Sequence, residues 1–539
     1  MVPEGKRIPP FWLFPAVLVH LAGILHRSIV EMGIIQKQSI RSTFIIMFGF
    51  ALGAFNILLL APQILTAEQL GLTRMITDIG LTMATFCTFG SLPVIYKFFP
   101  FYQSYLPAKK NDLPFVTLVI CLLGFTLMLI IGHFLKPVII RKYSTQSKLF
   151  VDYYYLVYPF CLFMLLYMWM ECFAWSFKKT VLSNTIKETT HRLIFVVLMV
   201  LFATGLINLT QLLWIFSFAY LPAVLLLLWS LRRSEGFALV PHISSVTRRM
   251  KGRMANFGLF LFGAQFLNLL SKTSDTMIIA AKTENGLAGA AVFTIATYVV
   301  TLMEIPQRSI TSISIPILSE SWRNKDMANI NHIYNKSVTN LLVVGLIMFS
   351  LTLLNSHNFE ASLSGDYKGI GTVIFFMGIG KLIDLGTGAN AQIIGTSSYW
   401  KTDFIFNAVY TSLAIPLNYI LISHYGLIGA AYSSLLSLTF FNLMRFSFLW
   451  YKFKQQPYTW KHLLVIMLAL VCGLIAYALP EMHLQMQLPK VVRRAPDVCV
   501  RSLVFLALFI PGLYYFRISD EINGLLKKYT GMAFGWIKR

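Results

Sequence analysis

Long apolar runs dominate the chain, and short polar segments separate them. A helix needs about 20 apolar residues to cross the hydrocarbon core of a bilayer, and the sequence holds about fourteen such runs. They lie near 40–62, 73–97, 113–135, 151–176, 182–205, 209–231, 255–281, 288–316, 337–355, 368–395, 402–423, 426–451, 459–479 and 499–518. The alternating ten-residue strands of a transmembrane barrel are not seen. The pattern therefore predicts an all-α polytopic membrane protein.

Composition supports a membrane protein and argues against a nucleic-acid-binding protein. The chain is 57% hydrophobic and 12% charged, whereas soluble domains are about a quarter charged. Its net charge of +23 would suit nucleic acid, but the basic residues lie in short loops between apolar runs. Such loops are typical of the cytoplasmic side of a membrane protein. The sequence predicts no nucleic-acid partner.

Lysine and arginine also predict the orientation. The loop 232–254 carries six of them: Arg232, Arg233, Arg248, Arg249, Lys251 and Arg253. Alternate loops hold almost none, as at 206–208, 282–287 and 424–425. Two loops assigned to that outer side, 136–148 and 480–498, do carry several lysines and arginines and depart from the pattern. Because the rule is statistical, the majority predicts a cytoplasmic (inner) membrane protein with both termini in the cytoplasm.

The basic loop also predicts the organisation into lobes. It divides the spans into six, six and two: an N-lobe at 32–231, a cytoplasmic linker at 232–254, a C-lobe at 255–453, and two last spans with a cytoplasmic tail at 454–539. Weak self-similarity supports two lobes, since Glu68-Gln-Leu-Gly-Leu and Glu284-Asn-Gly-Leu open corresponding spans, which end near Pro93 and Pro316. Parallel repeats of this kind are common in transporters.

The first 31 residues do not follow the pattern. The run Ile8–Leu25 is short and broken by prolines. A signal peptide would need a small-x-small cleavage site after it, which is missing. An extra span or an interfacial helix is a second interpretation. A start of translation at Met32 is the third, and we prefer it, so that residues 1–31 form an N-terminal extension.

The six cysteines lie in or beside apolar segments without metal-ligand spacing, and we expect them to be small core residues. They are Cys87, Cys121, Cys161, Cys172, Cys472 and Cys499. Catalytic signatures such as GxSxG, a phosphate-binding loop and HExxH are missing. The sequence therefore predicts neither an enzyme nor a bound cofactor.

Charged residues inside the spans are the candidate functional residues. A charge at the bilayer centre costs about 2.5–3.5 kcal/mol, so it needs a partner, a cavity or a function. Helical spacing places five pairs on one face each: Arg74 with Asp78, Glu188 with Arg192, Glu304 with Arg308, Lys272 with Asp275, and Lys381 with Asp384. Any single pair is explained either by the two charges neutralising each other inside the protein or by a water-filled cavity. Five pairs in one chain favour a water-filled cavity between two lobes.

Depth divides these candidates. Lys272, Asp275, Lys381 and Asp384 lie near the middle of the membrane, and either carboxylate is a candidate site for a coupling H⁺ or Na⁺. The cytoplasmic half holds a cationic set that Glu171 neutralises in part, namely Lys187, His191, Arg192, Arg308 and Arg445. Arginine and lysine hold phosphate oxygens through charge-assisted hydrogen bonds. The alternative for Lys187 and Arg445 is that they reach the interface.

Helix-breaking residues gather in three later spans. They are Pro306 and Pro316, then Gly378, Gly380, Gly386 and Gly388, and finally Pro416. Such residues are common in membrane helices for structural reasons. The functional alternative is a helix that bends during alternating access.

Three segments carry a resemblance to a known family. They are Gln36-Lys-Gln-Ser-Ile-Arg-Ser-Thr-Phe, Ile305-Pro-Gln-Arg-Ser-Ile with Ile315-Pro-Ile-Leu-Ser, and Tyr425-Gly-Leu-Ile-Gly-Ala-Ala-Tyr. With the fourteen spans, they resemble the polysaccharide (O-antigen type) flippases of the multidrug/oligosaccharidyl-lipid/polysaccharide exporter superfamily, over roughly 32–518. The arrangement of six, six and two spans is the more specific part.

The resemblance implies a V-shaped pair of lobes that flips polyprenyl-pyrophosphate-linked oligosaccharide to the outer leaflet for surface polysaccharide synthesis. Membrane lipids and other polysaccharide-assembly proteins would be its partners. In related peptidoglycan-precursor flippases, arginines on the first, second and eighth spans face the pyrophosphate. Arg41, Arg74 and Arg308 occupy those spans here. Arg308 is the best match, whereas Arg74 lies nearer the outer side.

Two other functions compete with this one. Cation-coupled multidrug exporters of the same superfamily have twelve spans and acidic cavities, unlike the basic vestibule predicted here. Polysaccharide polymerases and ligases generally carry a large external loop, and the longest outer loop here has about 20 residues. The sequence therefore favours a lipid-linked oligosaccharide flippase.

Overall fold

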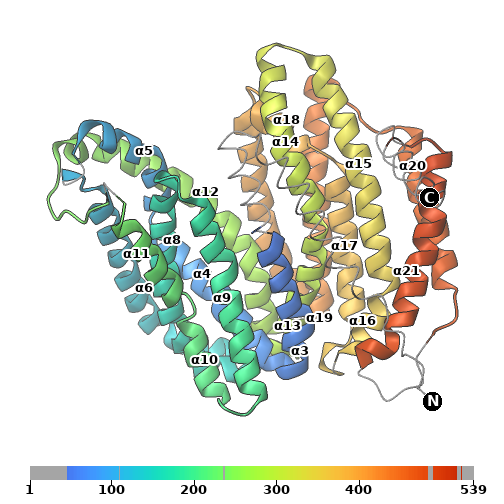
Figure 1. Ribbon diagram of the computed structural model, residues 1–539, viewed down its shortest axis with the longest axis horizontal. Coiled ribbons are helices and arrows are strands. Elements are labelled where there is room, and N and C mark those ends of the chain that lie inside the picture. Colours follow the sequence, from blue (N-terminus) through green and yellow to red (C-terminus); the bar gives the residue numbers. More distant parts are fainter. Residues whose placement is uncertain are drawn as a thin grey trace, which may run out of the picture.

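A computed structural model of the chain describes residues 45, 47–107, 110–234, 237–363, 365–482, 490–518 and 524. Every regular element within these ranges is helical, which confirms the predicted fold class. In Figure 1 the helices form two groups that diverge toward one end. The first group contains the blue to green helices and the second contains the yellow to red ones.

Nine helices in the described ranges are long and apolar enough to cross a membrane. They are Met47–Ile64, α6 (Leu113–Tyr143), Lys148–Ser176 with α7 (Lys148–Tyr153) and α8 (Val157–Ser176), Leu209–Arg232 with α10 (Leu209–Ser217) and α11 (Leu221–Arg232), α12 (Ser245–Lys282), α15 (Met327–Leu354), α19 (Trp400–Phe453), α20 (Trp460–Tyr477) and Arg493–Tyr515 within α21 (Lys490–Tyr515). The polytopic membrane architecture is thus confirmed.

Three bent helix pairs raise this number to twelve if each pair is one span. They are α4 (Ala67–Cys87) with α5 (Ser91–Tyr105), α13 (Gly286–Leu302) with α14 (Glu304–Arg323), and α17 (Ile370–Gly386) with α18 (Asn390–Thr396). The bends of the first two pairs are 47° and 48°. These are the second spans of the two predicted six-span sets, and the repeat itself stays a prediction.

Two further spans follow from helix geometry. Helix α19 has 54 residues and would be about 80 Å long, far beyond the roughly 30 Å of a bilayer core. Its backbone leaves the helical region at Gly426 (φ 59°, ψ −138°), where two spans meet. Helix α9 (Thr180–Ala203) has 24 residues, enough to cross, although its charges make it less apolar. With these two, the described spans agree with the predicted fourteen.

Two of the helix-breaking residues expected from the sequence, Pro306 and Gly388, lie at or beside breaks between helices, and Pro416 does not. The α13–α14 bend lies at Met303, and Pro306 follows in the first turn of α14, where a missing backbone N–H costs little. The break after α17 contains Gly388, whose φ of 62° suits glycine. Pro416 lies inside α19 without ending the helix.

Helix α12 joins the two groups. Near its start the Tyr102 hydroxyl of α5 lies 2.6 Å from the Thr247 hydroxyl. Near its end the Ser147 hydroxyl donates to the Ala280 carbonyl at 2.6 Å. Its other neighbours include α13 and α19. Although the sequence assigns α12 to the C-lobe, it is therefore hydrogen-bonded to the first group near both ends.

Small residues allow the closest helix approaches. A Cβ atom added at Gly71 of α4 would collide with the backbone carbonyl of Leu287 in α13. One added at Gly124 of α6 would collide with the carbonyl of Cys87. Close backbone packing of this kind is a main source of helix association in membranes.

Five of the six cysteines are buried, as expected of small core residues. Cys499 in α21 is exposed, and its assignment to the core was wrong. The apolar neighbours of Cys499 in sequence indicated the membrane, but not which face of the helix points outward.

Candidate functional site

The charged residues of α14 and α17 form one network. The Lys381 ammonium lies 3.0 Å from Glu304 Oε1 and 2.8 Å from Asp384 Oδ2. Glu304 Oε2 accepts a hydrogen bond from Arg308 Nη2 at 3.2 Å. Both predicted pairs therefore form, and Lys381 connects them across the two helices, which the spacing within each helix does not indicate.

Polar side chains extend the network to α19. The Gln307 amide accepts from Lys381 at 3.2 Å and donates to Asp384 at 3.3 Å. On the other carboxylate oxygen, Asp384 accepts from Asn442 at 3.1 Å. The Thr387 hydroxyl in turn donates to the Asn442 carbonyl oxygen at 2.8 Å. Three helices are thus held together by charge-assisted hydrogen bonds.

Local backbone breaks position this network. Glu304 is the first residue of α14, directly after the bend, where a carboxylate is favoured by the positive end of the helix dipole. Asp384 lies just before α17 ends at Gly386. The two carboxylates that Lys381 bridges therefore both lie where a span changes direction.

Exposure distinguishes Arg308 from the rest of the network. The Arg308 side chain is 57% exposed, whereas that of Lys381 is 9% exposed. Two cations and two carboxylates balance, so the network as a whole, Arg308 included, is neutral. The bond to Glu304 uses one of the five N–H donors of the Arg308 guanidinium. This geometry can hold an external anion at Arg308 while Lys381 stabilises the helices.

The charges of α9 pair within the first group. Arg192 lies 2.8 Å from Glu188, as predicted, and Lys187 lies 3.2 Å from Glu171 of α8. The Arg192 guanidinium also packs on the first span, since a Cβ at Gly49 would lie 2.9 Å from its Nη1. The ring of His191 stacks on that of Tyr220 at 5.3 Å. None of these pairs shares a residue with the α14–α17 network.

Arg445 has a partner that the sequence analysis missed. Its guanidinium donates two hydrogen bonds to Asp403 Oδ1, at 2.8 and 3.0 Å, and lies 3.9 Å from the Phe441 ring centroid. The side chain is 10% exposed. Because Asp403 is 42 residues away and on the other half of α19, helical spacing gave no signal of this pair. Arg445 is therefore buried against Asp403 and is not open to solvent.

Asp78 of α4 connects the two groups. It accepts from Arg74 at 2.8 Å and from the Thr276 hydroxyl of α12 at 2.6 Å. The predicted Lys272–Asp275 pair is missing from the ion pairs of the described residues: Lys272 is exposed, and Asp275 accepts from Asn418 of α19. Their i,i+3 spacing permits contact, but Asp275 is directed at another helix.

Two remaining expectations concern Arg41 and a coupling ion. Arg41 lies outside the described residues. Within the described ranges no group of three or more His, Cys, Asp or Glu side chains is placed to hold a metal ion. A proton or Na⁺ at Asp275 or Asp384 stays a prediction.

The chain is similar in structure to known membrane transporters. No protein-family model and no curated protein matches it. A solved structure described as lipid II flippase MurJ, inward closed conformation, superposes with a TM-score of 0.67 at 14% identity, covering 89% of this chain and 99% of that one. An inward-facing multidrug resistance MATE family transporter of the MOP superfamily gives 0.59 at 12% identity, covering 77% and 97%. The likeness shows that the chain has the fold these transporters share.

Lysine 381 should be essential for stability. Lys381→Met leaves Glu304 and Asp384 as unbridged carboxylates, and breaking a buried ion pair costs about 3–5 kcal/mol. We expect a lower melting temperature and lower abundance in detergent, partly restored by adding Asp384→Asn. The same change at exposed Lys251 of α12 is the control. Equal melting temperatures for Lys381→Met and Lys251→Met would contradict this role.

Proposed function

We propose that this protein flips a polyprenyl-pyrophosphate-linked oligosaccharide across the cytoplasmic membrane by alternating access, for surface polysaccharide synthesis such as that of O-antigen. The observation that carries the proposal is Arg308, a half-exposed guanidinium held at the bend of a broken span by a buried, charge-balanced network. A guanidinium binds phosphate oxygens in a bidentate manner, so it suits a pyrophosphate group.

The extent of the structural likeness supports a flippase over an exporter. The lipid II flippase structure covers 89% of this chain, and the multidrug transporter covers 77%. The chain has two spans beyond the two six-span sets, α20 and α21. The multidrug exporter is the second candidate, favoured by the shared core fold, and a cationic exposed group at the bend argues against it.

The geometry also supports alternating access. Helix α12 is hydrogen-bonded to the first group near both ends. Helix α13 packs closely on α4 where Gly71 meets Leu287, near the end of α12 far from the basic linker. The helix groups diverge at the opposite end in Figure 1, which is the linker end of α12. We infer a form closed toward the outside, with the exposed Arg308 and the partly exposed Lys187 available to a substrate entering from the cytoplasm.

Arg308 should be required for transport but not for folding. Arg308→Ala leaves Glu304 paired with Lys381, so abundance should stay near normal. A charged hydrogen bond is worth about 1.5–3 kcal/mol, so export should fall roughly tenfold to a hundredfold. Arg308→Lys should recover only part, since an ammonium is a point charge. Surface polysaccharide in a complemented deletion strain is the measurement.

Two variants control this experiment. Arg323→Ala removes a 76% exposed arginine from the same helix and should leave export unchanged. The double variant Glu304→Ala, Arg308→Ala separates binding from neutralisation, because it removes one carboxylate together with one cation and leaves Lys381 and Asp384 as a neutral pair. Recovered export in the double variant would contradict a binding role for Arg308.

The proposed orientation places the basic linker in the cytoplasm. Ser244 is buried and caps α12, so the exposed His242 is the better position for labelling the linker. The exposed Glu284 serves to label the loops predicted on the outer side of the membrane. In a Cys499→Ser background, which removes the exposed cysteine, we expect an impermeant thiol reagent added to intact cells to modify Glu284→Cys and spare His242→Cys. The reverse labelling would invert the proposed topology.

A further inference from the structure

Two exposed aromatic rings stack on each other in the first helix group. The rings of Tyr96 in α5 and Trp175 in α8 have centroids 5.6 Å apart and an angle of 27° between their planes. The two residues are 42% and 38% exposed. Neither of them belongs to the α14–α17 network or to the proposed pyrophosphate contact at Arg308.

A hydrogen bond holds this stack in place. The indole N–H of Trp175 donates to the Ser183 hydroxyl of α9 at 2.8 Å. A tryptophan that anchors a helix at the membrane–water interface keeps its apolar body in lipid and its N–H in water. Here the N–H is bound inside the protein while part of the ring stays exposed. Interfacial anchoring therefore does not explain the pair.

A charged pair lies one helical turn away on the same two helices. Glu171 precedes Trp175 by four residues on α8, and Lys187 follows Ser183 by four on α9, so each lies on the same helix face as its neighbour. Lys187 Nζ lies 3.2 Å from Glu171 Oε2, and the Lys187 side chain is 41% exposed. An ammonium has three N–H donors, so Lys187 can donate to a further oxygen atom while it stays paired.

The stack lies at the end where the two helix groups diverge. Tyr96 contacts α8, while the adjacent Lys97 lies 3.9 Å from the centroid of the Phe257 ring in α12. The exposed face of α5 is therefore bordered by α8 on one side and by the linker half of α12 on the other. In Figure 1, α5 and this half of α12 lie at the diverging end of the first group. In the proposed function, a substrate from the cytoplasm enters at this end.

The chemistry of these side chains matches a sugar ring. A pyranose ring presents C–H groups on its faces, and they are attracted to the electron-rich face of an aromatic ring. Its hydroxyl groups accept hydrogen bonds from charged donors, which are stronger than bonds between neutral groups. Because Lys187 and Glu171 balance in charge, this pair suits an uncharged sugar better than a phosphate, which needs excess positive charge.

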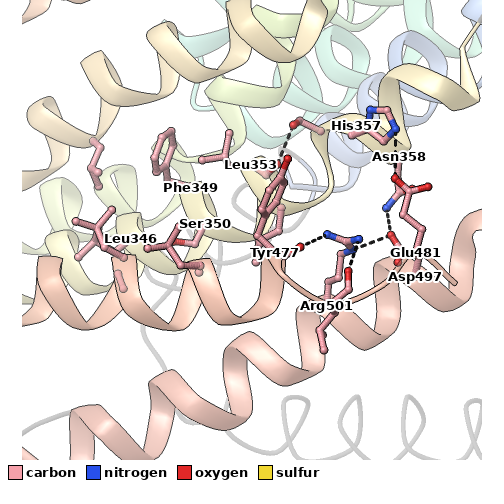
Figure 2. Close-up of a pocket in the computed structure, with 18 of the residues that line it drawn as sticks. Leu346, Phe349, Ser350, Leu353, His357, Asn358, Tyr477, Glu481, Asp497 and Arg501 are labelled. Carbon is pink, nitrogen blue, oxygen red and sulfur yellow. Dashed lines mark hydrogen bonds and ion pairs between the residues drawn. The ribbon is translucent and has the colours of Figure 1, made fainter.

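A cavity of about 840 Å³ beside the last two spans does not match a sugar in this way. Leu346 and Phe349 of α15 form one of its walls (Figure 2), and such side chains offer no hydrogen bonds to hydroxyl groups. At its polar end, Arg501 donates to Asp497 at 2.9 Å and to the Tyr477 carbonyl at 3.0 Å (Figure 2). These bonds join α20 to α21, so they are explained by packing of the last two spans.

We propose that Tyr96 and Trp175 form a stacking surface for a sugar ring of the lipid-linked oligosaccharide, with the Lys187 ammonium donating a hydrogen bond to a sugar hydroxyl. This inference rests on the proposed function and deepens it. The sugar contacts the first helix group, whereas the pyrophosphate contacts Arg308 of α14. Sugar and pyrophosphate are therefore recognised by different residues, and the two contacts can be weakened separately.

Variants of the stack separate sugar binding from the rest of the site. Tyr96→Leu and Trp175→Leu each remove an aromatic ring and keep an apolar side chain. Trp229→Leu is the matched control, because Trp229 of α11 is 58% exposed in the same helix group and is not part of the stack. Arg308→Ala is the comparison for the pyrophosphate contact.

The experiment measures binding to the full chain in lipid nanodiscs with two probes. One is the polyprenyl-pyrophosphate-linked oligosaccharide extracted from cells that lack the gene, and the other is polyprenyl pyrophosphate without sugars. We expect both stack variants to bind the first probe about fivefold more weakly than wild type, and the second equally well, at unchanged melting temperature. Trp229→Leu should bind both probes like wild type, and Arg308→Ala should bind both more weakly.

The outcomes distinguish this inference from the proposed function. Unchanged binding of the oligosaccharide probe by both stack variants, or an equal loss of both probes, would overturn the stacking surface and leave the proposed function standing. A wild-type protein that does not bind the oligosaccharide probe would contradict the proposed function and the inference together. Should Trp175→Leu not fold, Tyr96→Leu alone decides.

Discussion

The ion pairs of Lys381 with Glu304 and Asp384 are the interaction on which the second helix group depends. A charge inside a bilayer is costly unless it is paired, so this ammonium and two carboxylates must stay within contact distance of one another. They join α14 to α17 where both spans break, and Asn442 adds α19. The same bonds fix Glu304, and through it the exposed guanidinium of Arg308. Stability and the proposed substrate contact thus share one network but rest on different residues.

The two helix groups are joined by a different kind of bond. Threonine hydroxyls supply these bonds: that of Thr276 donates to the Asp78 carboxylate, and that of Thr247 lies 2.6 Å from the Tyr102 hydroxyl. The bond between the Thr82 and Thr273 hydroxyls, at 2.9 Å, belongs to the same seam. A hydrogen bond between neutral groups, such as Thr82 with Thr273, contributes only about 0.5–1.5 kcal/mol, so this part of the seam can open and close during the proposed transport cycle.

Much of the fold was predictable because the bilayer restricts a spanning chain to long apolar helices. Four of the five proposed intrahelical pairs form, since residues three or four apart share a helix face. Spacing along one helix carries no information about other helices, so the Lys381–Glu304 link and the Asp403 partner of Arg445 were missed. The Lys272–Asp275 pair was predicted wrongly for the same reason, because Asp275 accepts a hydrogen bond from Asn418 on another helix instead. Gln307 and Asn442 are polar residues within predicted spans, and they were the sequence feature that could have indicated contacts between these helices.

In the proposed function, this protein moves a lipid-linked oligosaccharide from the cytoplasmic to the outer leaflet. The most direct measurement is the leaflet distribution of that lipid in cells with and without the gene, probed from outside with an impermeant sugar-modifying reagent. Flipping by this protein predicts that the deletion strain accumulates the lipid in a form protected from the reagent. Complementation with the intact gene should restore outer-leaflet labelling. Unchanged labelling in the deletion strain, at an unchanged amount of the lipid, would contradict the proposed function.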